Sequence, residues 1–240
     1  MNKNEQKRAI EIIPAILPQD YAEVLDKVDK VKGLVSTIQI DICDGYFVPS
    51  FSWPYKKHDD SFEKMLHEEI GLPDWQDLEY EFDLMVDKPE EKVENFVMIG
   101  ASRIIIHAES KGDVVGAINS LQGKVEVGLA LNIATPVSVI EPLKDKIQFI
   151  QCMGINRVGY QGQSFEPKVL DKIQEIRAKY PDLMISVDGA VSLDTASLLL
   201  DAGADRLVVG SAIFNDENPG EVISKLRELQ MKFYRFALQN

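Results

Sequence analysis

The stretch IQIDICDG (residues 38–45) carries polar side chains at a spacing that could support acid–base or metal chemistry. Its three isoleucines alternate with Gln39, Asp41 and Cys43, and this period of two predicts a β-strand with one apolar and one polar face. An aspartate can transfer a proton, and carboxylates together with amide oxygens bind hard divalent cations. We therefore interpret the polar face as part of a functional site.

Polar side chains also stand near the ends of other apolar runs. They are Asp44, Glu81, Asp83, His107, Glu109, Asn132, Asp188 and Ser211. Where several carboxylates are buried at one rim, desolvation and mutual repulsion raise some of their pKa values. An aspartate in such a position can instead cap the next helix, which is a good interpretation of Asp44 and Asp194. Several residues separate Asp41 and Asp83 from any expected helix, so these two are better candidates for chemistry.

Short apolar runs, rich in isoleucine and valine, would position these side chains. They cover residues 11–17, 37–42, 80–86, 103–108, 125–131, 147–153, 183–189 and 206–212. Their nearly continuous apolarity is typical of parallel strands that are covered on both faces. Apolar residues at helical spacing fall between them, most clearly in 166–179 and in 192–202, where Ser192 is a candidate N-cap.

A repeated pattern marks the places where helices give way to strands. MIGASRIII (98–106) and DAGADRLVV (201–209) share a Gly-Ala-polar-Arg sequence followed by aliphatic residues. A glycine at this place suits the left-handed C-cap of a helix that leads directly into a strand.

Eight alternations of strand and helix in 240 residues predict a single-domain (β/α)8 TIM barrel spanning residues 1–240. A doubly wound open sheet is the alternative, but it usually carries a G-x-G-x-x-G nucleotide fingerprint, which the sequence lacks. In a barrel, catalytic groups come from the carboxyl ends of the strands and from the loops that follow. The segment 50–79, between the second and third expected strands, is long for one loop and one helix. We expect it to be surface decoration, although a lid, a partner surface or an enlarged helical layer would also fit.

The chain carries 39 acidic and 26 basic residues, a formal net charge of −13. This charge disfavours nucleic acid and anionic membranes as partners, whereas backbone amides can still bind a small anionic substrate. The two cysteines, Cys43 and Cys152, lie in apolar runs and are expected to be reduced. The sequence shows neither a signal peptide nor an apolar run of membrane-spanning length, so we expect a cytoplasmic protein.

Glycine-rich turns follow the last three expected strands, at 158–165, 188–191 and 209–214. Barrels often bind phosphate through backbone N–H groups in the loops after their seventh and eighth strands. Each glycine taken alone could serve only a tight turn. Three such turns on neighbouring strands favour a phosphate site.

Several of these stretches together resemble the ribulose-5-phosphate 3-epimerase family. The similarity runs in order through IIPAIL, IQIDICDGYFVPSFS, FDLMVDKPE, GLALNIATP, GYQGQSF, VDGAV and GSAIF, and covers nearly the whole chain. The most specific parts are D-x-x-D-G-x-F-V-P and G-Q-S-F. The resemblance implies a (β/α)8 isomerase of carbohydrate metabolism that interconverts C3 epimers of a pentulose phosphate through a metal-stabilised enediolate. It also implies a phosphorylated ketose as substrate and a homo-oligomer as the assembly.

The resemblance further implies roles for individual residues. Asp41 and Asp188 match the two aspartates that remove and return the C3 proton on opposite faces. The matching phosphate-binding residues are Gly162, Gly189, Ala190, Gly210 and Ser211. Two of the matched positions differ from the family, because Ala190 replaces a glycine and Ala15 replaces a serine near the substrate.

The metal-binding positions depart further from the family pattern. The family holds its metal with two histidines and the two catalytic aspartates, whereas this chain has Gln39 and Asp83 at the histidine positions. The matching ligand set is Gln39, Asp41, Asp83 and Asp188, all of them oxygen donors. Such ligands suit magnesium or manganese better than zinc or iron, so we expect a divalent metal of changed identity, or none. Without a cation, three adjacent carboxylates would repel one another.

The loop after the sixth expected strand reads INRVGYQGQSF, one residue longer than in the family, and carries Arg157. This arginine could contact a phosphate or a carboxylate of the ligand, or it could be a solvated surface residue.

Two other functions stay open: an epimerase of another phosphorylated ketose, and a catalytically silent phosphosugar-binding barrel. A decarboxylase or synthase of the neighbouring barrel group is disfavoured because it would carry a D-x-K-x-x-D motif. DLMVDKPE has no lysine two residues after Asp83.

Overall fold

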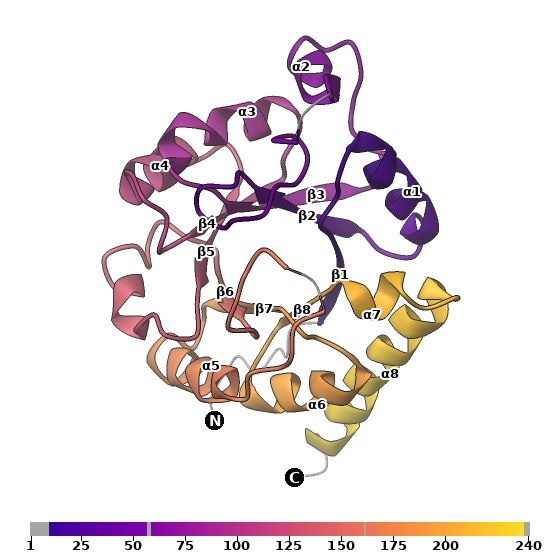
Figure 1. The fold of residues 1–240 in the computed structure, drawn as a ribbon. Coiled ribbons are helices and arrows are strands. Elements are labelled where there is room, and N and C mark those ends of the chain that lie inside the picture. The colour runs from indigo at the N-terminus through magenta and orange to yellow at the C-terminus, as the bar shows by residue number, and fades with distance from the viewer. Residues whose placement is uncertain (1–9, 57–58, 161, 238–240) are drawn as a thin grey trace.

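In the computed structural model, which describes residues 10–56, 59–160 and 162–237, eight parallel strands close into one barrel in their order along the chain. The strands are β1 (Glu11–Ile16), β2 (Thr37–Cys43), β3 (Glu79–Met85), β4 (Arg103–His107), β5 (Glu126–Leu131), β6 (Phe149–Met153), β7 (Met184–Asp188) and β8 (Arg206–Val209). Figure 1 looks down the axis of this ring. The predicted (β/α)8 barrel is confirmed, with every expected strand in place.

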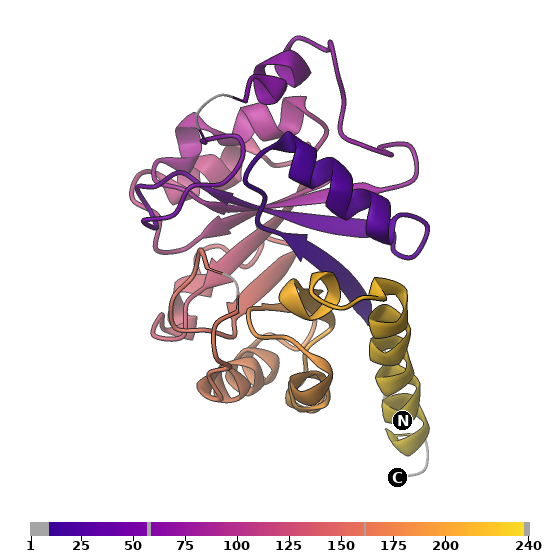
Figure 2. The same cartoon turned by 45° about the vertical axis from the view of Figure 1, so that its right-hand side comes forward.

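Helices surround the strands in the part of the chain that the structure describes. They are α1 (Tyr21–Val31), α2 (Ser61–Leu66), α3 (Val93–Met98), α4 (Val114–Ser120), α5 (Lys168–Lys179), α6 (Leu193–Ala202), α7 (Ser211–Phe214) and α8 (Pro219–Ala237), with the 3-10 helices η1 (Pro89–Glu91) and η2 (Val137–Ile140). Figures 1 and 2 show them on the outer side of the barrel. None of the helices in the described residues has the length and apolarity needed to cross a membrane. Cys43 and Cys152 are buried free thiols, as expected.

The two faces of strand β2 have different surroundings: one packs against the helices outside the barrel, and the other faces the polar interior of the barrel. Ile38, Ile40 and Ile42 are fully buried and belong to the large apolar cluster of the fold. Burial of each such side chain stabilises the fold by about 1.5–3 kcal/mol. Gln39 and Asp41 alternate with them and point into the barrel, where Gln39 reaches a residue of β7. The period of two read from the sequence therefore assigns both faces of this strand correctly.

The two glycines of the repeated pattern follow helices in the left-handed conformation. Gly100 comes after α3 with a φ of 102°, and Gly203 caps α6 with a φ of 113°. The alanine that follows each one donates its N–H to a carbonyl one turn back, as Ala204 does to Leu199 at 3.1 Å. Both glycine C-caps are confirmed, since a positive φ carries little steric cost only without a Cβ. The expected strand 206–212 is too long, because Gly210 leaves the strand conformation and α7 starts directly after it.

The segment 50–79 belongs partly to the core and partly to the surface. Trp53 is fully buried, packs on the ring of Phe62 at 5.6 Å between centroids, and donates from Nε1 to Ser61 Oγ at 2.7 Å. These contacts anchor the start of α2, although the helix stands out from the helical ring in Figures 1 and 2. Trp75, in contrast, is 65% exposed. Met65, Leu72 and Leu78 of the second half are nevertheless buried in the core, so surface decoration describes only part of the segment.

Charged side chains pair with one another inside the amino-terminal end of the barrel. Arg103 Nη1 lies 3.1 Å from Glu11 Oε1 and 3.6 Å from Glu81 Oε2. Arg206 Nε lies 3.1 Å from Glu11 Oε2, and its guanidinium covers the ring of Phe149. Glu81 is thus part of this buried ion cluster. Its proposed place at the opposite rim is wrong, because it comes only two positions after the start of β3.

Candidate active site

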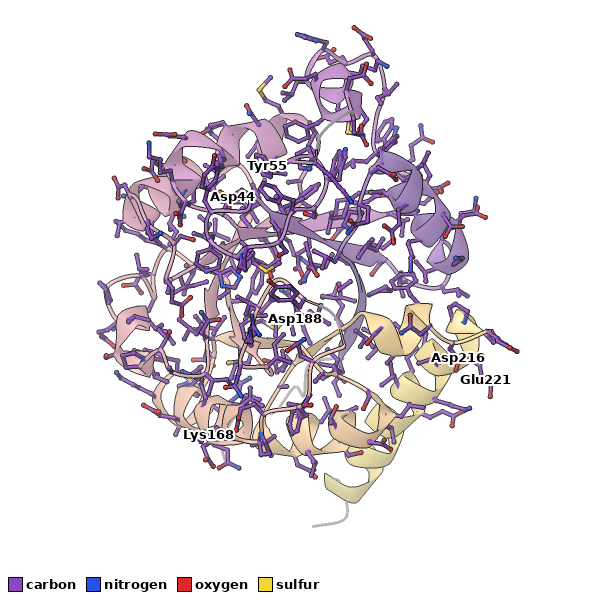
Figure 3. The ribbon with its side chains drawn as sticks, in the orientation of Figure 1. Asp44, Tyr55, Lys168, Asp188, Asp216 and Glu221 are labelled. Atoms are coloured by element: carbon purple, nitrogen blue, oxygen red, sulfur yellow. The ribbon has the colours of Figure 1, made fainter. Side chains whose placement is uncertain are left out.

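Three carboxylates meet inside the barrel toward its carboxyl end. They belong to Asp41 on β2, Asp83 on β3 and Asp188 on β7, and one oxygen of each lies within 4.8 Å of the others. The parallel register of β2 and β3 pairs Asp41 with Asp83. Asp188 is the last residue of β7, and its side chain reaches toward these two. Figure 3 shows Asp188 near the centre of the ring. The structure therefore brings together the three aspartates that the sequence singles out.

The side-chain amide of Gln39 connects two of these carboxylates. Its Nε2 donates to Asp41 Oδ1 at 2.7 Å and to Asp188 Oδ2 at 2.9 Å. Both hydrogens of the amide thereby find a carboxylate, which offsets part of the repulsion between the two acids. Gln39 is fully buried, and among the described residues its Oε1 has no hydrogen-bond partner.

Gln151 on β6 is a further member of the site and is absent from the predicted residues. Its Nε2 lies 3.2 Å from Asp83 Oδ2 and 3.5 Å from Asp188 Oδ2. The available signal is parity, because Gln151 alternates with Ile150 and Cys152 of the outer face. Any polar residue at an inward-facing position of a barrel strand is a candidate for the site, and this rule would have included Gln151.

His107, the last residue of β4, contacts the third carboxylate. Its Nε2 lies 3.1 Å from Asp83 Oδ1, and its Nδ1 lies 3.7 Å from Glu109 Oε2. The imidazole is fully buried and packs against the ring of Phe47, with 5.0 Å between the centroids. Burial alone would lower the pKa of His107, but the two carboxylates outweigh it and raise the pKa to about 10. A cationic His107 therefore offsets the charge of Asp83 at neutral pH.

The two aspartates joined by Gln39 have raised pKa values. Burial is the largest cause for Asp41, followed by the carboxylates of Asp188 and Asp83, and its pKa stands well above the ordinary value. For Asp188, burial and the neighbouring Asp83 carboxylate raise the pKa to about 7. Hydrogen bonds from Gln39 oppose both shifts. A carboxyl group with a pKa near neutrality can both give and take a proton at neutral pH.

The donor atoms of the site fit a divalent cation. Hard cations bind carboxylate oxygens at about 2.0–2.6 Å, so three oxygens within 4.8 Å of one another can share one ion. Gln39 Oε1 is buried and unpaired within the described part of the chain, so this oxygen is not already engaged by another side chain. The cluster of Asp41, Asp83 and Asp188 could therefore bind such an ion.

A pocket of about 550 Å³, including its open mouth, lies against the aspartates. Asp41 and Asp188 are part of its wall. The predicted phosphate-binding residues also line it, namely Gly162, Gly189, Ala190, Gly210 and Ser211. Gly189 and Ala190 both have a positive φ, of 101° and 55°, so the turn after β7 holds a conformation that alanine rarely adopts. All five predicted residues thus face the same cavity as the two aspartates.

Arg157 lies outside this wall. Its side chain is exposed, and its guanidinium stacks over Tyr160 at 5.5 Å from the ring centroid. Tyr160 lines the pocket, so Arg157 contacts a residue of the pocket wall without being part of that wall. Its role as a loop contact stays a prediction.

Asp44 and Asp194 do not have the capping roles expected of them. The Asp44 carboxylate accepts three backbone N–H groups of nearby loops and the ammonium group of Lys92. The N-cap of α6 is Ser192, as predicted, and Asp194 lies in the first turn of that helix. Asp44 therefore organises the loops beside the site, and Figure 3 shows it above and to the left of Asp188.

Comparison with known proteins gives matches that span almost the whole chain. A family model described as the ribulose-phosphate 3 epimerase family matches residues 11–214. The ribulose-phosphate 3-epimerase of Bacillus subtilis is 32% identical over 225 residues, which are 91% of this chain and 98% of that protein. The cytoplasmic isoform of ribulose-phosphate 3-epimerase from Oryza sativa is 32% identical over 232 residues, with coverages of 92% and 94%.

Among solved structures, 3-keto-L-gulonate-6-phosphate decarboxylase from Vibrio cholerae superposes with a TM-score of 0.69. The superposition covers 94% of this chain and 99% of that one at 12% identity. At this level of identity, the likeness shows the barrel fold alone.

Proposed function

Since the chain belongs to the ribulose-phosphate 3-epimerase family, we propose that this isomerase inverts C3 of a ketopentose phosphate, with Asp41 and Asp188 as its acid and base. One observation carries the assignment of the two residues. Their carboxylates converge on a single hydrogen-bond donor, Gln39, and both line the same pocket.

Inversion at C3 requires a base on one face of the carbon and an acid on the other. The C3 proton is weakly acidic because it is α to the carbonyl, and one carboxylate takes it as the enediolate forms. The second group, as a carboxylic acid, then gives a proton to the opposite face. Raised pKa values of Asp41 and Asp188 suit this exchange, because one of the two can be protonated while the other is ionised. After one turnover the first group is protonated and the second is ionised. The reverse reaction can therefore use the same two groups with the acid and base roles exchanged.

The substrate phosphate is assigned to the turns after β7 and β8. Gly189, Ala190, Gly210 and Ser211 line the pocket there, and the described residues of its wall include no lysine or arginine. Backbone N–H groups and the Ser211 hydroxyl are then the donors that a phosphate would meet. A neutral cradle of this kind binds an anion within a chain of strongly negative net charge.

The same aspartates would hold a divalent cation. Asp41, Asp83 and Asp188 supply carboxylate oxygens, and Gln39 Oε1 is the fourth oxygen donor. A bound cation stabilises negative charge that develops on the substrate oxygens. The absence of imidazole or thiolate from this donor set favours magnesium or manganese over zinc or iron.

Cytoplasmic location and a homo-oligomeric state are part of the proposal. The rice relative carries the word cytoplasmic in its name. Tyr46 and Phe51 are 77% and 51% exposed, and such large apolar side chains are candidates for contact with a second copy of the chain. Size-exclusion chromatography with light scattering measures the assembly.

Hydrogen exchange at C3 tests the proposed activity. The protein is stripped of metal, then incubated with ribulose 5-phosphate in deuterated water with magnesium, manganese, zinc or iron added separately. We expect deuterium at C3 and formation of the epimer when magnesium or manganese is present. Asp41→Asn and Asp188→Asn should each lower the exchange rate by at least about 100-fold. Asp145→Asn, the same change on an exposed turn, is the matched control.

The other outcomes lead to different functions. Binding of the sugar phosphate without exchange under every metal would identify a silent phosphosugar-binding barrel. Exchange with another ketose phosphate alone would identify a different substrate. Exchange that needs zinc would contradict the preference for a hard ion.

A further inference from the structure

Position 83 carries an aspartate where the family pattern has a metal-binding histidine, and the fold supplies this aspartate with a partner of its own. We propose that His107, oriented by Glu109, is a positioning residue that fixes the Asp83 carboxylate for binding of a divalent cation. The inference rests on the cation site of the proposed function. It does not require that the substrate be a pentulose phosphate.

The contact between His107 and Asp83 is buried and direct. Nε2 of the imidazole lies 3.1 Å from Asp83 Oδ1, and neither side chain is exposed. Nδ1 on the opposite edge faces Glu109 Oε2 at 3.7 Å. The ring of Phe47 packs against the imidazole. His107 therefore lies between two carboxylates, one of which belongs to the candidate cation site.

Glu109 is itself held by the loop after β5. Its Oε1 accepts the backbone N–H of Asn132 at 2.9 Å and the hydroxyl of Thr135. The carbonyl of Thr135 in turn accepts the ammonium group of Lys172, a buried residue of α5. A rotation of the imidazole would break its contact with Asp83 and would move Nδ1 away from Glu109 Oε2, which stands at an ion-pair distance and not at a hydrogen-bond distance. The orientation of His107 is thus tied to an outer helix and to a loop, and not to Asp83 alone.

Neighbouring side chains hold both oxygens of the Asp83 carboxylate. Oδ1 is engaged by His107, and Oδ2 is directed toward Gln151, whose Nε2 lies 3.2 Å from it and 3.5 Å from Asp188 Oδ2. A ligand that is already ordered loses little freedom when an ion binds. Loss of a residue that orients a metal ligand weakens metal affinity by about 10- to 100-fold.

Two amide substitutions at position 107 separate positioning from packing. The amide nitrogen in His107→Gln can stand near the place of Nε2 and reach Asp83, whereas the shorter side chain in His107→Asn cannot. We expect His107→Asn to bind Mn²⁺ about 10- to 100-fold more weakly than the unmodified protein, and His107→Gln to stay within about threefold of it. The electron paramagnetic resonance signal of free Mn²⁺ gives the affinity without any turnover. His67→Asn, the same change at an exposed position after α2, is the matched control.

A double-mutant cycle then asks whether His107 acts through Asp83. In an Asp83→Asn background, His107→Asn should cause no further loss of Mn²⁺ affinity. Equal affinities for the two position-107 variants, or a full additional loss in that background, would overturn the inference. If urea denaturation shows that His107→Asn is unfolded, Glu109→Gln replaces it. That variant should weaken Mn²⁺ binding at least about threefold, and an unchanged affinity would overturn the inference.

The outcomes also distinguish this inference from the proposed function. An unmodified protein that binds no Mn²⁺ would overturn both the inference and the proposed cation site. Coupling between His107 and Asp83 in a protein that shows no C3 exchange would support the inference and contradict only the epimerase activity.

Discussion

Gln39 Nε2 lies 2.7 Å from Asp41 Oδ1 and 2.9 Å from Asp188 Oδ2, so one amide group holds both acids of the site. An amide nitrogen has two hydrogens, whereas a ring nitrogen of histidine has at most one. A histidine at position 39 could therefore not donate to both carboxylates from a single atom. The glutamine couples the two acids, because a change in the charge of either one alters the hydrogen bond that the other receives.

Removal of this donor should slow catalysis more than it disturbs the fold. In Gln39→Leu both carboxylates lose a hydrogen bond of about 1–3 kcal/mol each, and their repulsion is no longer offset. We expect the rate of C3 exchange to fall about 10- to 100-fold. Gln174→Leu, the same change on the exposed face of α5, should leave the rate unchanged. An unchanged rate in Gln39→Leu, in a protein that resists urea like the original, would contradict the role of the bridge.

The identity of the bound metal should follow the ligand type at two positions. The double variant Gln39→His/Asp83→His replaces two oxygen donors by imidazoles, which suit zinc and iron. After dialysis against an equal mixture of magnesium, manganese and zinc, we expect the original protein to retain manganese or magnesium and the variant to retain zinc. Mass spectrometric metal analysis measures both. Stoichiometric zinc in the original protein would contradict this prediction.

The barrel and the two proposed catalytic aspartates could be predicted from the sequence because both depend on short-range patterns. Alternation in IQIDICDG assigns Ile40 to the core and Asp41 to the interior, and the parallel register then pairs Asp41 with Asp83. The turns after β7 and β8 could be predicted on the same grounds, because they directly follow recognisable strands.

Contacts across the barrel could not be predicted in this way. Whether His107 meets Asp83, and whether Gln151 reaches Asp188, depends on the stagger with which eight strands close. The same stagger places Glu81 among arginines at the other end of the barrel. Asp44 was misassigned for a different reason, because its partners come from loops whose course has no periodic signal.

Asp44 should stabilise the fold in a manner that depends on pH. Burial alone would raise the pKa of Asp44, but hydrogen bonds from Lys92 and three backbone N–H groups outweigh it and hold the pKa below its ordinary value. The contribution is therefore complete above the pKa of the unfolded chain, about 4, and is lost as the pH falls through the lower pKa of the folded state. Asp44→Asn should lower the free energy of unfolding by about 1–3 kcal/mol at pH 7.

Urea denaturation at pH 7, 5 and 3 measures this difference for Asp44→Asn. The gap between the variant and the original protein should stay constant from pH 7 to 5 and narrow at pH 3, because the original carboxyl is then becoming protonated. Asp145→Asn on an exposed turn should show almost no gap at any of these values. A gap that is independent of pH would mean that the carboxylate charge of Asp44 is not what the loops require.

Gly154, directly after β6, should be intolerant of any side chain. Its N–H donates to the carbonyl of Asp188 at 2.6 Å, and a Cβ at this position would stand 2.3 Å from the carbonyl oxygen of Gly189. Both partners are backbone atoms, so they can make room only if the turn after β7 moves. That turn carries Asp188 at one end and the pocket residue Ala190 at the other.

Gly154→Ala should therefore lower the free energy of unfolding by about 1–3 kcal/mol and raise KM for the sugar phosphate as well. A loss of stability alone would mean that the turn after β7 recovers its shape, whereas a raised KM indicates that the phosphate cradle has moved. Gly71→Ala is the matched control, because its Cβ would meet nothing closer than the Trp75 side chain at 3.5 Å, an ordinary contact. If the two variants had equal stability and equal KM, the turns after β6 and β7 could not approach each other as closely as the structure shows. The geometry of Asp188 depends on that approach.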